Sequence, residues 1–467
     1  MNLRTRRILY SFFIAIFAIA APTLVLYTAG FRYDFKYNRI VETGSLVIKS
    51  YPENASIYID GKLLEQTTPT IINTILPGKI NLLVEKEGYH SWEKTIEIFH
   101  RVSTFEESIK LYPNTDPKSI IDLNVKKYWW NNKQDKIAYT TNSNELRLFN
   151  TLNQKDTLIA NLDKNDLTGF SWSPHDDQFI FGRGTKQTEY YIVDAHGLDK
   201  IISLNSIFKS KLESLQWDPS GKNTIYALLD GSLYRIPYLL KTKRLISDEF
   251  IQFYLVENKR ILLAEKTNLD EILVSWINPS NPSIIHLIPE IIADENDEFI
   301  KTNSHRIAVL NKKLETLTIV DPSIKKNAIE DDNIKIENIK NLIWSNDGQT
   351  LVYTDEFGIY KKSFISPITI IPTKNISRLI VKYTQKIKNI AWAGDESHLL
   401  YSTNNTLRVA EINPSSDPRS AILLESSAEN IAVANNANLI TFIDKGKLQA
   451  IPISIENNRR SFLFGNK

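Results

Sequence analysis

The chain of 467 residues contains no cysteine. This absence excludes structural disulfides, iron–sulfur clusters, thiolate zinc sites and cysteine nucleophiles. An exported protein of this composition must therefore be stabilised by its hydrophobic core alone. Neither sign of charge dominates, because 56 Lys and Arg face 54 Asp and Glu and leave a formal net charge of +2. With this balance of charge, we expect no basic surface that would bind nucleic acid.

Signatures of common catalytic sites are absent as well. No His-Glu-x-x-His motif occurs, and no two histidines have the spacing of metal ligands on a helix. The seven histidines are His90, His100, His175, His196, His286, His305 and His398. There is no Gly-x-Ser-x-Gly nucleophile elbow and no Gly-rich loop to cradle a phosphate. We therefore predict no catalytic residue, no cofactor, no cofactor-binding residue and no metal ligand.

A few short patterns carry reactive or charged residues without the rest of a site. They are Ser206 with Lys209, Ser323 with Lys326, the acidic run Asp294, Glu295, Asp297 and Glu298, and the pairs Asp176-Asp177 and Asp331-Asp332. The two Ser-x-x-Lys matches lack the companion motifs of enzymes that use this pair. The acidic run lacks the Gly that a calcium loop needs at its sharp turn. We interpret the acidic residues as solvated loops.

One long apolar stretch runs from Ile8 to Ala29 and contains no charged residue. About 22 helical residues at about 1.5 Å each span about 33 Å, enough to cross a hydrocarbon core of about 30 Å. Three arginines, at positions 4, 6 and 7, precede the stretch. Such clusters stay on the cytoplasmic side of a membrane. We therefore predict one span in the lipid bilayer, with the residues that follow it outside.

Two other interpretations of this stretch stay open. A cleaved signal peptide has an apolar region of about 7–15 residues that ends at small residues. Residues 18–21 supply such a site, but residues 23–27 continue apolar past it, which favours an uncleaved anchor. A buried helix of a soluble protein is the third interpretation.

Beyond residue 30 the sequence alternates apolar and polar residues over short runs and has no amphipathic pattern of 12 or more residues. This alternation predicts an all-β exterior. In residues 31–43 the aromatic residues Tyr33, Phe35 and Tyr37 alternate with charged residues. Aromatic rings beside a span commonly lie at headgroup level, although a short strand or plain linker fits this segment as well.

Residues 44–113 contain short strands separated by turn residues. In order, these are Pro52-Glu53-Asn54-Ala55, Asp60-Gly61, Thr68-Pro69, Leu76-Pro77-Gly78 and Gly88-Tyr89. This order resembles the PEGA domain, which is named for a Pro-Glu-Gly-Ala tetrapeptide. Asn54 stands where Gly is usual, and Asn tolerates a left-handed backbone best after Gly, so we expect the turn to be kept. The resemblance implies a small β-domain of bacterial surface and envelope proteins that serves as a spacer or binding module and has no catalytic residues.

From about residue 128 the chain repeats a strand ending on Trp, a polar turn and a second strand. The Trp positions are 130, 172, 217, 344 and 392, with steps of 42, 45 and 48 between sequence neighbours. These steps match one four-stranded propeller blade. Trp217 and Trp344 are 127 positions apart, and degenerate units at Phe253 and Phe299 fill this gap. A last unit starts at Ile431. We predict a β-propeller of about eight blades, with seven as the alternative.

The Trp residues are interpreted as packing residues between blades, with ligand stacking as the alternative. The Ser-Pro-x-Asp and Asn-Asp-Gly turns are similar to those of TolB-type and WD40-like propellers. The Gly-His and Trp-Asp dipeptides of the full WD40 signature are absent. The subfamily therefore stays open.

In chain order, the predicted parts are a cytoplasmic tail (1–7), a transmembrane anchor (8–30), a juxtamembrane linker (31–43), a PEGA-like β-domain (44–113), a linker (114–127) and a β-propeller (128–467). We predict a membrane-anchored extracytoplasmic binding or scaffold protein of the bacterial cell envelope, not an enzyme, which presents the propeller to an envelope protein or glycan. The alternative is an envelope hydrolase that acts on glycans or peptides through propeller loops. The inner tail is too short for the output domain of a sensor, and the sequence indicates no oligomeric state.

Overall fold

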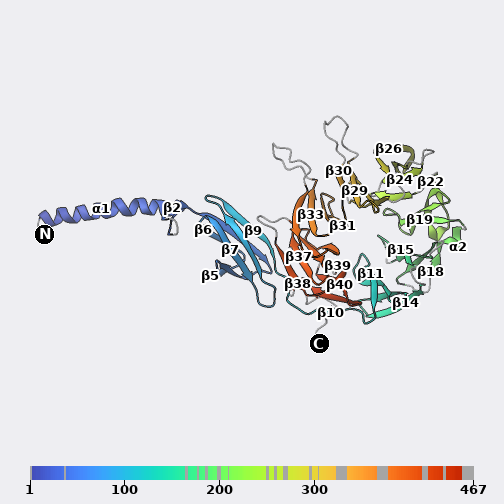
Figure 1. The fold of residues 1–467 in the computed structure, drawn as a ribbon, viewed down its shortest axis with the longest axis horizontal. Coiled ribbons are helices and arrows are strands. Elements are labelled where there is room, and N and C mark those ends of the chain that lie inside the picture. The colour runs from blue at the N-terminus through green and yellow to red at the C-terminus, as the bar shows by residue number, and fades with distance from the viewer. Residues whose placement is uncertain are drawn as a thin grey trace. The chain divides into compact units, whose positions relative to one another are not determined.

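The computed structural model describes residues 3–35, 38–162, 167–175, 178–184, 188–196, 201–208, 210–248, 252–256, 260–266, 272–293, 297–302, 304, 306–321, 334–364, 377–412, 419–434 and 438–454. The chain forms two compact units. The first comprises Met1–Asp116, Glu411–Leu423 and Ile451–Arg459, and the second comprises Pro117–Ala410, Leu424–Ala450 and Arg460–Lys467. Described residues are mainly in β-strands, as predicted, and Figure 1 shows their order along the chain.

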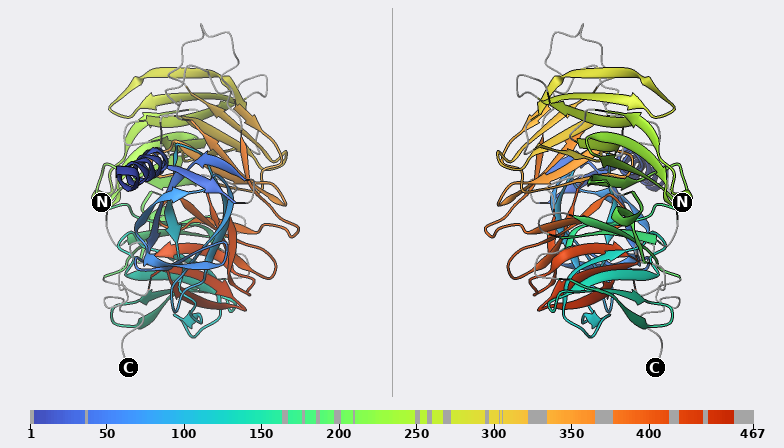
Figure 2. Two further views of the ribbon diagram at one scale, coloured as in Figure 1. Left: turned by 90° about the vertical axis from the view of Figure 1, so that its left-hand side faces the viewer. Right: turned by 90° about the vertical axis from the view of Figure 1, so that its right-hand side faces the viewer.

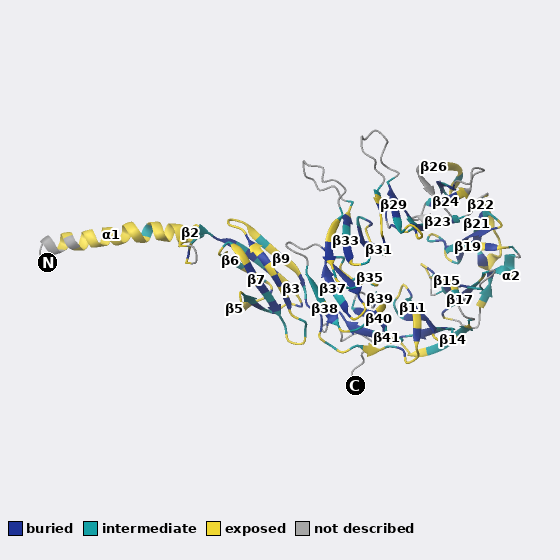
Figure 3. Ribbon diagram, viewed as in Figure 1, coloured by how far each residue is buried: buried dark blue, intermediate teal, exposed yellow. Residues whose placement is uncertain are grey.

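The first unit begins with the apolar helix α1 (Leu3–Thr28). Its segment Leu9–Thr28 has a mean hydropathy of 2.2 and contains no buried residue, and Figure 3 shows nearly all of this segment exposed. By length and composition this helix can cross a membrane. Arg32 donates to the Tyr27 carbonyl at 2.7 Å, which places a cation at the helix C-terminus, where the helix dipole favours positive charge.

A hairpin of β1 (Phe31–Asp34) and β2 (Arg39–Glu42) follows the helix. Two sheets come next, with strand orders β6-β3-β9 and β5-β4-β7-β8. Their strands are β3 (Gly44–Tyr51), β4 (Ser56–Ile59), β5 (Lys62–Thr67), β6 (Thr70–Ile75), β7 (Gly78–Glu85), β8 (Trp92–Ile98) and β9 (Ser103–Lys110). Alternate residues of β3 and β8 are buried, and Leu46, Ile57, Leu82 and Trp92 meet in one core. Period-two alternation thus buries one face of each strand.

The turns of this small domain have the predicted backbone conformations. Asn54 has φ +58°, and the hairpin turn at Asp60 and Gly61 has φ +48° and +77°. Thr68 fixes the first turn, because its carbonyl accepts from the Asn54 N–H at 2.7 Å and its hydroxyl accepts from the Ala55 N–H at 3.0 Å. The Thr-Pro motif and the tetrapeptide therefore support each other.

Eight further four-stranded sheets lie between Lys118 and Pro452, and each is a propeller blade. Blade 1 is β11 (Val125–Trp130), β12 (Lys136–Thr141), β13 (Glu145–Asn150) and β14 (Lys155–Asn161), and blade 2 is β15 (Leu167–Trp172), β16 (Gln178–Arg183), β17 (Glu189–Asp194) and β18 (Ile201–Ser203). Blade 3 is β19 (Leu212–Trp217), β20 (Thr224–Leu229), β21 (Ser232–Pro237) and β22 (Arg244–Ser247), and blade 4 is β23 (Gln252–Val256), β24 (Arg260–Lys266), β25 (Ile272–Asn278) and β26 (Asn281–Ala293). Short helices, α2 (Leu204–Phe208) and η1 (Tyr238–Leu240), accompany blades 2 and 3.

The remaining blades follow the same order. Blade 5 is β27 (Asp297–Ile300), β28 (Ile307–Asn311), β29 (Thr316–Val320) and β30 (Ile334–Ile336), and blade 6 is β31 (Asn341–Trp344), β32 (Thr350–Thr354), β33 (Gly358–Ser363) and β34 (Arg378–Lys382). Blade 7 is β35 (Asn389–Trp392), β36 (His398–Ser402), β37 (Leu407–Glu411) and β38 (Ser420–Leu424). Blade 8 is β39 (Glu429–Ala434), β40 (Leu439–Asp444), β41 (Lys447–Pro452) and β10 (Lys118–Ser119). The prediction of eight blades is confirmed, including the two degenerate units at Phe253 and Phe299 and the last unit at Ile431.

The ring closes by pairing the two ends of the repeat. β10 precedes blade 1 in the sequence, yet it is the outer strand of blade 8, where Lys118 pairs with Ala450 and Ser119 with Gln449. Closure of this kind leaves only short blade edges exposed. Neighbouring blades lie face to face in the side views of Figure 2, and the second strands β12, β20 and β36 are buried throughout.

Candidate functional site

The Trp side chains that end the innermost strands lie in the seams between blades. Trp172 Nε1 donates to the Trp129 carbonyl of blade 1 at 3.1 Å. Trp217 Nε1 donates to the Ser171 carbonyl of blade 2 at 3.1 Å. In the same way, Trp392 Nε1 of blade 7 donates to the Trp344 carbonyl of blade 6 at 2.8 Å. Each bond ties one blade to the backbone of the preceding blade, which supports the packing interpretation of these indoles.

The seam between blades 8 and 1 uses a tyrosine. Tyr128 Oη lies 2.8 Å from the Thr441 carbonyl and 2.6 Å from the Asn430 carbonyl and donates to them. Trp130 Nε1 donates to Thr441 Oγ1 at 3.3 Å. Burial raises the pKa of Tyr128 well above its usual value, so the hydroxyl keeps the proton that it donates.

The seam between blades 5 and 6 is built differently. Trp344 Nε1 is buried and has no hydrogen-bond partner among the residues that the structure describes. Arg306 of blade 5 instead donates to the Gly348 carbonyl of blade 6 at 3.3 Å, and its guanidinium lies 4.6 Å from the centre of the Phe364 ring. Burial lowers the pKa of Arg306, and the nearby Asp321 carboxylate opposes that shift.

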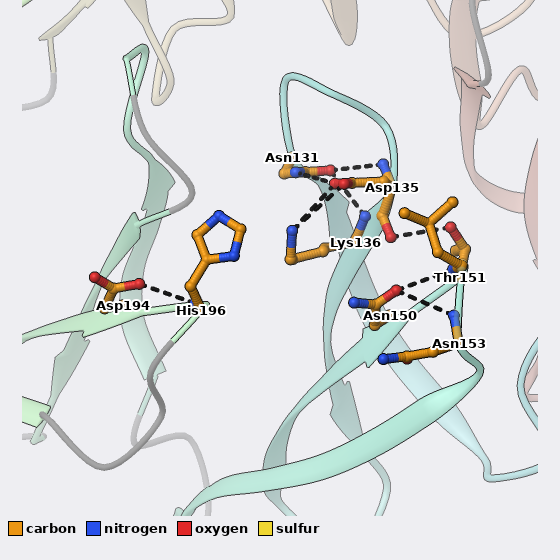
Figure 4. Close-up of polar contacts among 9 residues, drawn as sticks. Asn131, Asp135, Lys136, Asn150, Thr151, Asn153, Asp194 and His196 are labelled. Atoms are coloured by element: carbon orange, nitrogen blue, oxygen red, sulfur yellow. Dashed lines mark hydrogen bonds and ion pairs between the residues drawn. The ribbon is translucent and has the colours of Figure 1, made fainter.

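A polar cluster occupies the turn after the innermost strand of blade 1 (Figure 4). Asn131 Oδ1 accepts from the backbone N–H groups of Asp135 and Lys136 at 3.0 and 2.9 Å. Lys136 Nζ lies 3.4 Å from both carboxylate oxygens of Asp135. Thr151, in the next turn on this face, donates its N–H and hydroxyl to the Asp135 carbonyl at 3.0 and 2.9 Å. These bonds fix the turn in one conformation.

The same face of the propeller continues into blade 2. Asn132 Nδ2 donates to the Ser173 carbonyl at 3.0 Å, which joins the first turns of the two blades. In the β17–β18 turn, the His196 N–H donates to Asp194 Oδ1 at 2.9 Å, and the side chain is exposed. In the view of Figure 4, the His196 imidazole lies between Asp194 and the turn that contains Asn131. We call the turns 131–136, 150–153 and 194–196 the polar loop face. The exposed side chains of Asn153 and His196 on this face suit hydrogen bonding to polar ligands.

Tyrosines with raised pKa lie inside the blades. Tyr139 Oη donates to Asp156 Oδ2 at 2.8 Å, and Arg147 Nε donates to the same oxygen at 3.1 Å. Burial, reinforced by the Asp156 carboxylate, raises the pKa of Tyr139. In blade 3, Arg235 Nε donates to the buried Asp218 at 2.7 Å. Structural ion-pair networks perturb pKa values as active sites do, and these networks join strands or turns of one blade.

The first unit contains a buried group of charges. Lys94 Nζ lies 3.0 Å from Glu411 Oε2 and 3.6 Å from Glu106 Oε2, and the Lys94 and Glu106 side chains are each 4% exposed. Trp92 Nε1 donates to Glu411 Oε1 at 2.6 Å. Arg419 donates to the Ser91 carbonyl at 2.6 Å. Burial lowers the pKa of Arg419 to about 10, so the guanidinium is still charged at neutral pH.

Among the described residues that the sequence singled out for chemistry, none forms a catalytic or metal-binding group with another. Ser206 donates its hydroxyl to the Ser203 carbonyl at 2.9 Å, and Glu298 forms an ion pair with Lys312. Among the described residues, no group of three or more His, Asp or Glu side chains could hold a metal ion. Residues outside the described ranges are Asp176, Asp177, Lys209, Asp294, Glu295, His305, Ser323, Lys326, Asp331 and Asp332.

The sequence missed the polar loop face and the buried charges. Asn131 and Lys136 belong to no sequence motif of a binding site. Glu411 is 317 positions from Lys94, so no local pattern joins them. The signal that was available is the polar residue that directly follows four of the five repeat Trp residues, at positions 131, 173, 218 and 345.

The fold and the site define a β-propeller protein with a small β-domain and an apolar N-terminal helix. Residues 43–114 match the PEGA domain family, which confirms the resemblance of the turn motifs. No curated protein sequence matches the chain significantly. A propeller together with a PEGA domain suggests a binding or scaffold role.

Solved structures similar to this chain include propellers of low sequence identity. The C-terminal WD40 domain of Sif2 is 13% identical with a TM-score of 0.44, covering 72% of this chain and 97% of that domain. The Myceliophteria thermophila Cps50 (Swd1) β-propeller domain is 13% identical with a TM-score of 0.40, covering 73% and 98%. A eukaryotic initiation factor is 10% identical with a TM-score of 0.47, covering 85% and 93%. The strand order of the eight sheets is what shows the propeller.

Proposed function

We propose that this protein is a membrane-anchored extracytoplasmic scaffold of the bacterial cell envelope, which presents its propeller to an envelope protein or glycan. The observation that carries the proposal is the exposed apolar segment Leu9–Thr28 directly before a PEGA domain. A helix with no buried residue has no protein core to shield it from water, whereas a bilayer removes that apolar surface from water.

The proposed orientation rests on the arginines that precede the helix. Three arginines precede the apolar segment and would stay in the cytoplasm. The proposed division of the chain is a tail at 1–7, an anchor at 8–30, a linker at 31–43, the PEGA domain at 44–113, a linker at 114–127 and the propeller at 128–467. The PEGA domain would then act as a spacer, and the polar loop face would offer the binding surface.

The orientation is tested by labelling single cysteines, because the natural chain has none. Thr5→Cys, Lys62→Cys and Asn153→Cys place one thiol in the tail, the PEGA domain and the propeller. A maleimide that cannot cross membranes should label the second and third variants in intact cells and the first only after lysis. If only Thr5→Cys is labelled in intact cells, the orientation is the reverse of the one proposed and the proposal is wrong.

The binding surface is tested by capture from envelope fractions with the full-length protein. Asn153→Arg and His196→Arg place bulky cations on the polar loop face. Asn142→Arg is the matched control, because Asn142 is exposed at the opposite end of blade 1. A partner that survives Asn142→Arg and is lost with the other two supports the surface. Equal capture by all three variants would exclude this face.

A further inference from the structure

Exposed apolar side chains gather at the end of the first unit that adjoins α1. The β1–β2 hairpin exposes Tyr33, Phe35 and Ile40 by 47%, 83% and 59%. The turn between β8 and β9 exposes Phe99 and Val102 by 52% and 53%. We call these five residues the apolar end. Gathered apolar side chains of this kind mark a contact surface.

Hydrogen bonds join the hairpin, the turn and the end of α1. Thr43 follows β2 and donates its N–H and hydroxyl to the Gly30 carbonyl at 2.9 and 2.8 Å. The Arg101 N–H in the turn donates to the Thr43 carbonyl at 3.2 Å. Gly44 leaves no room for a side chain, because a Cβ there would collide with the Phe99 carbonyl oxygen. The turn is thus fixed beside the helix end, although it comes about 70 residues later in the sequence.

We infer that the apolar end rests in the interfacial layer of the bilayer and so fixes the orientation of the PEGA domain on the membrane. The inference rests on the proposed anchor. Thr28 ends α1 and Phe31 begins β1, and three extended residues reach only about 10 Å. A span that fills the hydrocarbon core therefore leaves the hairpin at headgroup level.

The chemistry of the apolar end suits a lipid surface. Tyrosine and other aromatic rings concentrate at the membrane–water interface, because one part of the ring is apolar and another is wet. Arg39 and Arg101 stand among the apolar residues and are exposed, and Arg101 also forms an ion pair with Glu42. Cations at this level attract the phosphates of anionic lipids. The occupant is therefore the lipid headgroup region, and the hairpin and the turn give it two separate contacts.

The depth of each position can be measured on the full-length protein in lipid nanodiscs. A fluorescent NBD group is attached to one cysteine in Ala18→Cys, Val102→Cys or Glu87→Cys, and nitroxide lipids quench it. Glu87 is exposed in the turn at the far end of β8, about 20 Å away at about 3.3 Å per residue. We expect deep nitroxides to quench position 18, headgroup nitroxides to quench position 102 at least threefold more than position 87, and position 87 to stay near background.

The outcomes separate the two proposals. If position 18 is not quenched, the anchor itself is wrong. If position 18 is quenched while positions 102 and 87 are quenched to the same extent, the anchor is supported and the interfacial position of the apolar end is contradicted.

A second measurement uses variants of exposed side chains. Phe35→Ser with Phe99→Ser should lower the quenching at position 102 by half or more. Ile71→Ser with Phe105→Ser is the control, because both side chains are more than half exposed in the same unit but lie outside the apolar end. Equal quenching in the two double variants would contradict the inference.

Discussion

Replacing Lys94 by Met should destabilise the first unit strongly. Met keeps most of the apolar stem of Lys and removes only the ammonium group. The Lys94 ammonium lies between two buried carboxylates, at 3.0 Å from Glu411 and 3.6 Å from Glu106. Its removal takes this ammonium away from two buried carboxylates, and a buried charge that loses its counter-charge is costly.

The size of the effect follows from these distances. With an effective dielectric constant of about 20, each attraction is about 5 kcal/mol before desolvation is subtracted. Removing one partner of a buried pair costs about 3–5 kcal/mol. Lys79→Met is the control, because Lys79 is exposed on the neighbouring strand β7 and exposed substitutions usually stay within about 0.5 kcal/mol.

The assay should be local, because a chain of two units need not unfold in one step. Hydrogen exchange of the β8 peptide reports the free energy of opening there. The expected loss corresponds to roughly a hundredfold to a few thousandfold faster exchange. Lys94→Met combined with Glu411→Gln should recover part of the loss, because Gln removes one carboxylate charge and still accepts from Trp92. The reasoning is refuted if the double variant costs the sum of both single changes, or if Lys94→Met matches Lys79→Met.

Three further predictions concern the seams and acid stability. Tyr128→Phe leaves carbonyls of blade 8 without their donor and should cost about 1–3 kcal/mol, measured as faster exchange in β40. Trp172→Phe should destabilise more than Trp344→Phe in thermal unfolding, because only the Trp172 indole N–H has a described partner. Burial and the Arg419 charge lower the pKa of His90 below 6.5, so the unfolded chain takes up the proton first and the native first unit loses stability as the pH falls below 6.5, until the folded pKa is passed. Denaturant midpoints between pH 7.5 and 5 should show this loss, and His90→Gln should reduce it.

Local patterns predicted the elements of this fold. The absence of charge between Ile8 and Ala29 predicted the apolar helix, and turn chemistry predicted the positive φ at Asn54 and Gly61. The spacing of Trp residues predicted the blades, and even the units at Phe253 and Phe299 were found by counting steps. These features share one property: each depends on local composition or on regular spacing along the sequence.

Contacts between segments that are far apart in the sequence could not be predicted from such patterns. β10 pairs with β41 across more than 300 residues, and its two residues carry no strand signal of their own. The polar loop face combines turns from two blades, and the apolar end combines the hairpin with the Phe99 turn. Periodicity identifies which residues are buried but not which buried residues meet, so these sites required the structure.

The polar bonds between blades explain why the middle of the propeller looked degenerate in the sequence. Trp indoles join blades 1 and 2, 2 and 3, and 6 and 7. Gln216 donates to the Phe253 carbonyl between blades 3 and 4 at 3.3 Å, and Arg306 joins blades 5 and 6. Between blades 4 and 5, the described residues meet in an apolar cluster around Phe299. A blade can therefore lose its Trp where another donor or apolar packing holds the seam, because ring closure constrains every seam at once.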